Sequence, residues 1–255
     1  MKKFILASNW KLNGNYNIIS NFIYKLKKYI LLNKIYYTIV FIPPIVYINS
    51  IKDKINNENF FLGAQNVDIN LFGAFTGEIS IKMLKDIGVK YVIIGHSERR
   101  LFHNESNEYI AKKFHIIKQN NMIPILCIGE TFKEKQCNKT NIVCKKQIDS
   151  ILKISGDNAF HNTIIAYEPI WAIGSGKSAN IKYVRKINQF IRSYISNNSN
   201  INMNDITIQY GGAVNPENIQ IIFEEPEING VLLGGVSLIY EKFIKIIDII
   251  HKINK

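Results

Sequence analysis

Hydrophobic residues along the chain fall into short continuous runs, separated by longer segments in which apolar residues recur at helical spacing. The short runs are rich in Ile, Val, Phe and Tyr and do not alternate with polar residues, as is typical of strands buried on both faces. We predict eight strands, at residues 4–9, 37–42, 60–65, 91–94, 123–128, 163–168, 206–210 and 230–233.

The segments between these runs have the pattern of amphipathic helices. In residues 16–32, for example, Ile19, Phe22, Ile23 and Leu26 recur every three or four positions and share one helical face. The same spacing predicts helices at 105–120, 140–155, 181–197 and 238–253, and shorter ones at 46–56, 81–86 and 216–223. The last of these would begin near Pro216, where a missing N–H costs nothing.

Strand followed by helix, eight times over, favours a closed barrel over an open doubly wound sheet, and the count of eight decides between them. The predicted fold class is therefore α/β, with a single (β/α)8 barrel over residues 1–255 as one catalytic domain. The chain length suits one such barrel. No Pro/Gly/Ser-rich linker divides the sequence.

Composition narrows the possible partners. The net charge of +12 suggests anionic partners, but the lysines are spread along the whole chain, so we predict no nucleic-acid binding. No run of eighteen apolar residues occurs, so no membrane span is expected, and the start of the chain resembles a first strand of a cytoplasmic protein more than a secretory signal. The three cysteines, Cys127, Cys137 and Cys144, form no CxxC pair, so we expect free thiols. No His/Cys cluster has ligand spacing, so we expect no metal, and we expect no cofactor either.

Reactive side chains follow several of the predicted strands. Asn9 and Lys11 come at and after the end of the first strand, His96 follows the fourth, and Glu168 ends the sixth. Glycine pairs follow the seventh and eighth strands, at 211–212 and 234–235. Because the loops at the carboxyl ends of barrel strands build the active site, these groups are expected to converge on one mouth.

This set of groups has a joint chemical meaning. A carboxylate can act as a general base, an imidazole can donate a hydrogen bond to a carbonyl oxygen, and an ammonium can stabilise an oxyanion. Backbone N–H groups of glycine loops can bind phosphate. Singly, a lysine is usually a solvated surface residue and a glycine pair usually marks a turn. Together they predict proton abstraction next to a carbonyl group on a phosphorylated substrate.

Longer segments around these residues resemble motifs of the triosephosphate isomerase family. The motifs occur in the family's order from residue 9 to residue 237, which is nearly the whole chain. The segment at 166–177 is the longest and most specific. The matching segments are Asn9-Trp10-Lys11-Leu12-Asn13, Gly63-Ala64-Gln65-Asn66-Val67-Asp68, Gly73-Ala74-Phe75-Thr76-Gly77-Glu78, Gly95-His96-Ser97-Glu98-Arg99-Arg100, Cys127-Ile128-Gly129-Glu130, Ala166-Tyr167-Glu168-Pro169-Ile170-Trp171-Ala172-Ile173-Gly174-Ser175-Gly176-Lys177, Tyr210-Gly211-Gly212 and Gly234-Gly235.

The resemblance implies a TIM barrel that interconverts dihydroxyacetone phosphate and D-glyceraldehyde 3-phosphate through an enediolate, in glycolysis and gluconeogenesis. Glu168 would be the base, and His96 would polarise the substrate oxygens and move protons between them. Lys11 would place positive charge near the enediolate, and Asn9 would add a hydrogen bond. The substrate-binding residues that the resemblance implies are Asn9, Lys11, Gly174, Ala213, Gly234 and Gly235.

The same resemblance makes residues 169–177 a mobile lid, with Pro169 stiffening one hinge, residues 177–179 forming the other, and Gly174 and Gly176 permitting the backbone change. Ala213 departs from the pattern, because family members commonly carry Ser there. Glu98 is open between two roles, a support for Lys11 or His96 and an ion pair with a cation such as Arg99.

Loop 66–80 is long for a connection between a strand and a helix. In the family this loop inserts into a second subunit, with Thr76 near the partner's site, so we expect a homodimer. Leu71, Phe72 and Phe75 would otherwise be exposed.

Two other functions compete with this prediction. Another phosphate-binding barrel enzyme, for instance one acting on carbon–carbon bonds, would keep the glycine loops but needs different residues at the strand ends. A basic anion-binding protein on a retired barrel would have clustered lysines and a lost catalytic residue, whereas Asn9, Lys11, His96 and Glu168 are all present.

Overall fold

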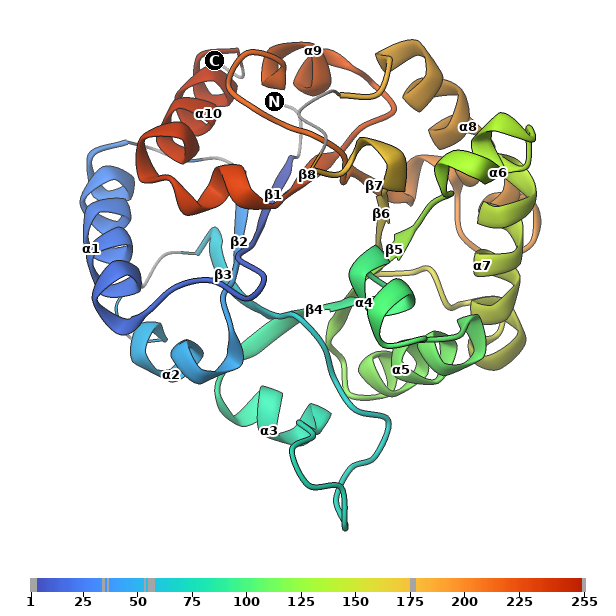
Figure 1. Ribbon diagram of the computed structural model, residues 1–255, viewed down its shortest axis with the longest axis horizontal. Helices are drawn as coiled ribbons and strands as arrows, with labels where there is room; N and C mark the ends of the chain where they lie inside the picture. Colours follow the sequence, from blue (N-terminus) through green and yellow to red (C-terminus); the bar gives the residue numbers. More distant parts are fainter. Residues whose placement is uncertain are drawn as a thin grey trace.

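The computed structural model describes residues 4–33, 35, 37–52, 54, 58–174 and 178–253. Within these residues, eight parallel strands pair in chain order, and β8 pairs with β1 to close a barrel that the helices surround (Figure 1). This confirms the predicted (β/α)8 barrel. The strands are β1 (Ile5–Asn9), β2 (Thr38–Ile42), β3 (Phe60–Ala64), β4 (Val89–Ile94), β5 (Ile123–Ile128), β6 (Ile164–Tyr167), β7 (Thr207–Tyr210) and β8 (Gly230–Leu233).

The helices cover the outside of the barrel. They are α1 (Tyr16–Leu32), α2 (Ile48–Ile51), α3 (Ile81–Asp86), α4 (Ser97–Phe102), α5 (Asn107–Gln119), α6 (Phe132–Gln136), α7 (Thr140–Ser155), α8 (Ile181–Asn197), α9 (Ile219–Glu224) and α10 (Tyr240–Ile253). The 3-10 turns in the described residues are η1 (Ile45–Tyr47), η2 (Ile170–Ala172), η3 (Met203–Asp205) and η4 (Gly235–Leu238). No helix in the described ranges is both long and apolar enough to cross a bilayer.

Several predicted boundaries are wrong, and local capping explains two of them. The helix expected at 105–120 begins at Asn107, because the Ser106 side chain accepts the Tyr109 N–H and caps it. The helix expected at 216–223 begins at Ile219, because the Asn215 side chain accepts the N–H groups of Glu217 and Asn218 and closes a turn there. Helix α2 ends at Ile51, well short of the predicted 56, although 53 and 55–57 lie outside the described residues.

The hydrophobic core has two layers, one inside the barrel and one between the strands and the surrounding helices. Inward side chains such as Ala7, Val40 and Ile93 fill the barrel, and outward ones pack against the helices. Trp10, for example, meets the Phe22 ring of α1 and the Phe41 ring of β2, each with ring centroids 5.1 Å apart. Burial of one large apolar side chain contributes roughly 1.5–3 kcal/mol, so this wall rigidly positions the loops at its mouth.

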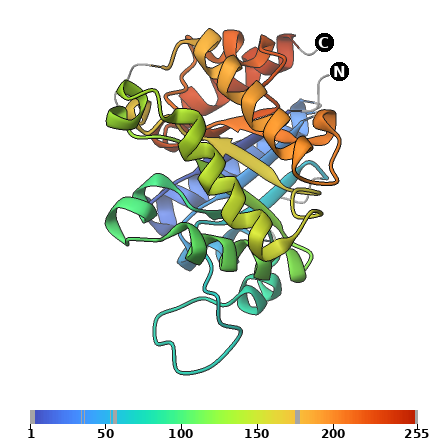
Figure 2. The same ribbon diagram turned by 90° about the vertical axis from the view of Figure 1, so that its right-hand side faces the viewer.

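The loop between β3 and α3 projects away from the barrel (Figure 2). Its base is firmly held, because the Asp68 N–H donates to the Ile79 carbonyl at 2.9 Å and Lys113 Nζ donates to Asn66 Oδ1 at 2.7 Å. At its tip, Phe72 is 81% exposed and Phe75 is 47% exposed in the single chain. Loop 66–80 is thus held at its base and exposes apolar side chains at its tip.

Candidate active site

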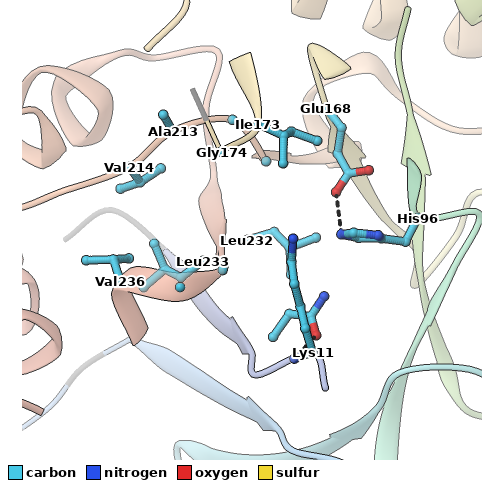
Figure 3. A pocket seen from close by; sticks show the side chains of 15 residues that line it. Lys11, His96, Glu168, Ile173, Gly174, Ala213, Val214, Leu232, Leu233 and Val236 are labelled. Atoms are coloured by element: carbon cyan, nitrogen blue, oxygen red, sulfur yellow. Dashed lines mark hydrogen bonds and ion pairs between the residues drawn. The ribbon is translucent and has the colours of Figure 1, made fainter. Parts of the chain in front are cut away.

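A cavity of about 280 Å³ lies at the carboxyl ends of the strands (Figure 3). It brings together all the predicted site residues that the structure describes, whereas Gly176 and Lys177 of the predicted lid lie outside the described residues. The lining residues are Asn9, Lys11, His96, Glu168, Ile173, Gly174, Gly211, Gly212, Ala213, Val214, Leu232, Leu233, Gly234, Gly235 and Val236.

Glu168 follows β6 directly and is 2% exposed. The backbone N–H of Ser97 donates to Glu168 Oε2 at 3.2 Å, and His96 Nε2 lies 3.4 Å from Oε1. In Figure 3 the carboxylate and the imidazole point towards each other and are in direct contact. Because it is held by weak neutral contacts and kept from bulk water, this carboxylate can accept a proton from a bound substrate.

Two glycines make room for this carboxylate. A Cβ atom at Gly129 would lie 1.9 Å from the carbonyl oxygen of Glu168, and one at Gly211 would lie 2.7 Å from Glu168 Cγ. Any side chain at either position would displace Glu168. Neither role was predicted from the sequence, in which the available signal was a glycine immediately beyond each of the two strands that flank β6.

Cys127 lies on β5, beside Glu168, and is buried. Burial, followed by the neighbouring Glu168 carboxylate, raises the pKa of the Cys127 thiol well above its ordinary value. The thiol therefore stays protonated and belongs to the buried cluster inside the barrel.

His96 caps the N-terminus of α4. Its Nδ1 accepts the Glu98 N–H at 3.2 Å, so Nδ1 carries no proton and the neutral ring carries its proton on Nε2. The His96 side chain is 8% exposed. A neutral imidazole that presents Nε2–H to the cavity is suited to donate a hydrogen bond to a substrate oxygen.

Lys11 stands in the left-handed backbone region, with φ of 52°. Such a conformation costs about 1–3 kcal/mol in a non-glycine residue, so the surroundings must hold it in place. The Lys11 N–H donates to Asn9 Oδ1 at 3.0 Å, and Gln65 Nε2 donates to the Lys11 carbonyl at 2.9 Å. These bonds hold the strained residue at the barrel mouth.

Glu98 supports the ammonium of Lys11, since Lys11 Nζ lies 2.5 Å from Glu98 Oε1. The cation that pairs with Glu98 is thus Lys11, whereas Arg99 Nε donates to Glu105 Oε1 at 2.6 Å. The Lys11 side chain also lies beside the loop after β8, where a Cβ atom at Gly234 would be 3.5 Å from Lys11 Cε.

The other end of the cavity is formed mainly by backbone. The loop after β7 lines it from Gly211 to Val214, and the loop after β8 lines it from Gly234 to Val236. The 3-10 turn η4 begins at Gly235, and the leading N–H groups of such a turn have no partners within it. This end can therefore donate hydrogen bonds to an anion. Among the described residues, no group of three or more His, Cys, Asp or Glu side chains could hold a metal ion.

The barrel and this site define an enzyme that moves a proton next to a carbonyl group on a small anionic substrate. Comparison with known proteins gives a consistent result, because the profile of the family described as Triosephosphate isomerase matches residues 4–250. The chain belongs to the triosephosphate isomerase family.

Individual relatives match over nearly their full lengths. Triosephosphate isomerase of Buchnera aphidicola subsp. Cinara cedri is 53% identical over 251 residues, which cover 98% of this chain and 99% of the relative. That of Buchnera aphidicola subsp. Acyrthosiphon pisum is 54% identical over 252 residues, with 99% of each chain covered. That of Enterobacter cloacae is 46% identical over 247 residues, covering 97% of this chain and 96% of the relative. Neither alternative function is favoured by these matches.

Proposed function

We propose that the chain interconverts dihydroxyacetone phosphate and D-glyceraldehyde 3-phosphate by proton transfer through an enediolate. The observation that carries the proposal is a carboxylate, a neutral imidazole and an ammonium that line one cavity beside two glycine loops. The names of the relatives support the choice of substrate.

The geometry supports the following sequence of steps. Glu168 accepts a proton from the carbon next to the substrate carbonyl, while His96 Nε2–H donates to the carbonyl oxygen, where negative charge develops. The Lys11 ammonium stabilises that charge in a site that excludes most water. Glu168 then returns the proton to the adjacent carbon, and His96 moves the hydroxyl proton between the two oxygens. Asn9 uses its side-chain oxygen to hold Lys11, which leaves its NH2 group to donate to the substrate.

The phosphate would lie at the glycine-lined end, bound by the backbone N–H groups of Gly174, Ala213, Gly234 and Gly235. Lys11 supports this placement, because its side chain lies beside Gly234 and so extends from the reacting end towards the phosphate. No metal or cofactor is needed for this chemistry.

We further propose that residues 1–255 act as one catalytic domain and assemble as a homodimer through loop 66–80. The exposed apolar tip of the loop supports this, because a second copy could cover it. In this role the enzyme would serve glycolysis and gluconeogenesis in the cytoplasm, without binding nucleic acid or membrane.

A coupled assay of triose phosphate interconversion tests the catalytic proposal. Glu168→Gln keeps the shape of the side chain but removes the base, so kcat should fall by about 10²–10⁴-fold. Glu224→Gln, at an exposed position on α9, is the matched control and should retain wild-type activity. Undiminished turnover in Glu168→Gln, or no conversion by the wild type, would overturn the assignment.

A further inference from the structure

The carboxylate of Glu130 is fully buried and lies outside the catalytic cavity. Its Oε1 accepts hydrogen bonds from Trp171 Nε1 at 2.8 Å and from the Tyr183 hydroxyl at 3.1 Å, and its Oε2 accepts one from the Tyr167 hydroxyl at 3.1 Å. The proposed catalytic steps use none of these groups. The contact with Trp171 is nevertheless close to the site, because Trp171 belongs to η2, which follows Glu168 and Pro169.

The indole of Trp171 is held from a second direction by Lys135. The ammonium of Lys135 lies 3.4 Å from the Trp171 ring centroid and 5.1 Å from that of Tyr183. A cation over the face of an indole is attracted by the negative charge of the π system. Trp171 therefore contacts a carboxylate at its N–H edge and an ammonium at its face.

Both charged groups come from the connection between β5 and α7, and this connection is rigid. Gly129 is tied to α7, because its N–H donates to Gln147 Oε1 at 3.0 Å and its carbonyl accepts from Gln147 Nε2 at 3.2 Å. Thr131 and Glu134 form a capping box at the start of α6, the helix that carries Lys135. The connection between β5 and α7 therefore holds Trp171, which belongs to the loop after β6.

Trp171 is closely connected to the catalytic cavity. The Ile173 N–H donates to the Ile170 carbonyl at 3.2 Å within the turn that holds Trp171, and both Ile173 and Gly174 line the cavity. A rotation of the indole would move this turn, and with it the Gly174 N–H that is proposed to bind phosphate.

We infer that Lys135 is a positioning residue, which holds Trp171 and thereby sets the place of Ile173 and Gly174 at the catalytic cavity. The importance of this for turnover rests on the proposed function. The contact between Lys135 and Trp171 is a separate matter and can be tested without substrate.

Tryptophan fluorescence tests the contact. The chain has two tryptophans, and Trp10 is 1% exposed, so acrylamide quenching reports mainly on the half-buried Trp171. Lys135→Met keeps the length of the side chain but removes the charge, and quenching should increase. Lys135→Arg keeps a cation over the ring and should restore wild-type quenching. Lys133→Met removes the same charge from an exposed position on α6 and should behave as wild type.

Phosphate affinity tests the positioning. Inorganic phosphate, titrated by calorimetry, should bind Lys135→Met about two- to fivefold more weakly, which is the change expected for a partly exposed cation–π contact. In the coupled assay, KM should rise by a similar factor and more than kcat falls. Lys135→Arg should reverse both effects, and Lys133→Met should show neither.

The outcomes separate the two proposals. Equal quenching of Lys135→Met and Lys133→Met would overturn the contact, and increased quenching with unchanged phosphate affinity would overturn the positioning role. A wild type that binds phosphate but does not isomerise triose phosphates would overturn the proposed function alone. A wild type that does not bind phosphate would overturn both the phosphate site and the positioning role.

Discussion

Lys11 shows how a single residue is fitted to the site at a cost in backbone energy. Its left-handed conformation is one that glycine would adopt without strain, yet glycine would remove the ammonium from the cavity. Asn9 and Gln65 supply the hydrogen bonds that offset the strain. The charge and the backbone conformation at this position are therefore separate requirements.

Ala213 is the residue at which this chain departs from the pattern common in its family. The family resemblance implies that a serine hydroxyl at this position would bond the closed lid near Gly176, which lies outside the described residues here. One such hydrogen bond contributes roughly 0.5–1.5 kcal/mol. We predict that Ala213→Ser raises turnover or lowers elimination of phosphate from the enediolate, measured by coupled assay and by release of inorganic phosphate. If turnover and elimination both stay at wild-type values, the prediction fails.

At the scale of elements, Glu105 links α4, α5 and the base of loop 66–80. Its Oε1 accepts hydrogen bonds from Arg99 Nε and from Lys113 Nζ, each at 2.6 Å, and Lys113 also binds Asn66. Burial alone would raise the pKa of Glu105, but the hydrogen bonds and charges of Lys113 and Arg99 outweigh it, so the pKa lies below its ordinary value.

This lowered pKa predicts a pH dependence of stability. Because the folded pKa is below the unfolded value of about 4.3, the contribution is complete above about pH 5 and is lost as pH falls through the folded pKa. Glu105→Gln should lower the free energy of unfolding at pH 7 by about 3–5 kcal/mol, since it leaves Lys113 buried without its anion. The variant should also lose stability less steeply than wild type below about pH 5. Denaturant unfolding at a series of pH values and fixed protein concentration measures both, and identical pH slopes would contradict the linkage.

The elements that sequence predicted well are those with a strong hydrophobic pattern. Helices α1, α7 and α8 and strands β5 and β8 have the predicted bounds, because each presents a full apolar face or run. Helix α6 was missed, since a five-residue exposed helix has no such face, and its only signal was the pairing of Thr131 with Glu134.

The candidate site was predictable to a similar degree and for a related reason. Barrel topology brings every strand end to one mouth, so the placement of Asn9, Lys11, His96 and Glu168 follows once the strands are known. Three features of the site were not predicted. They are the hydrogen bond from the Ser97 N–H to Glu168, the close approach of Gly129 to Glu168, and the contacts that Glu130 and Lys135 make with Trp171. Backbone donors carry no residue signature, and close approach between distant segments depends on the packed structure.

At the scale of the whole molecule, the exposed apolar tip of loop 66–80 leads to the prediction that two copies of the chain assemble into a dimer. Wild type should sediment at micromolar concentration with twice the mass of the 29.4 kDa chain. Phe72→Asp would place a charge in the proposed interface and should shift the protein towards monomer, with loss of activity. Tyr24→Asp, at a residue 69% exposed on α1, is the control. An active wild-type monomer at that concentration would refute the dimer.

The close approach of Gly129 and Gly211 to Glu168 has a consequence for how this scaffold can change. The glycines that follow β5 and β7 lie on either side of Glu168, and neither position has room for a side chain unless Glu168 moves. New specificity on this framework is expected in the loop after β8, where a Cβ atom at Gly234 would lie 3.5 Å from Lys11 Cε and one at Gly235 would meet nothing within 4 Å. The surroundings of Glu168 are therefore constrained, and the loops at the rim of the barrel are the part in which evolutionary or engineered variation is expected.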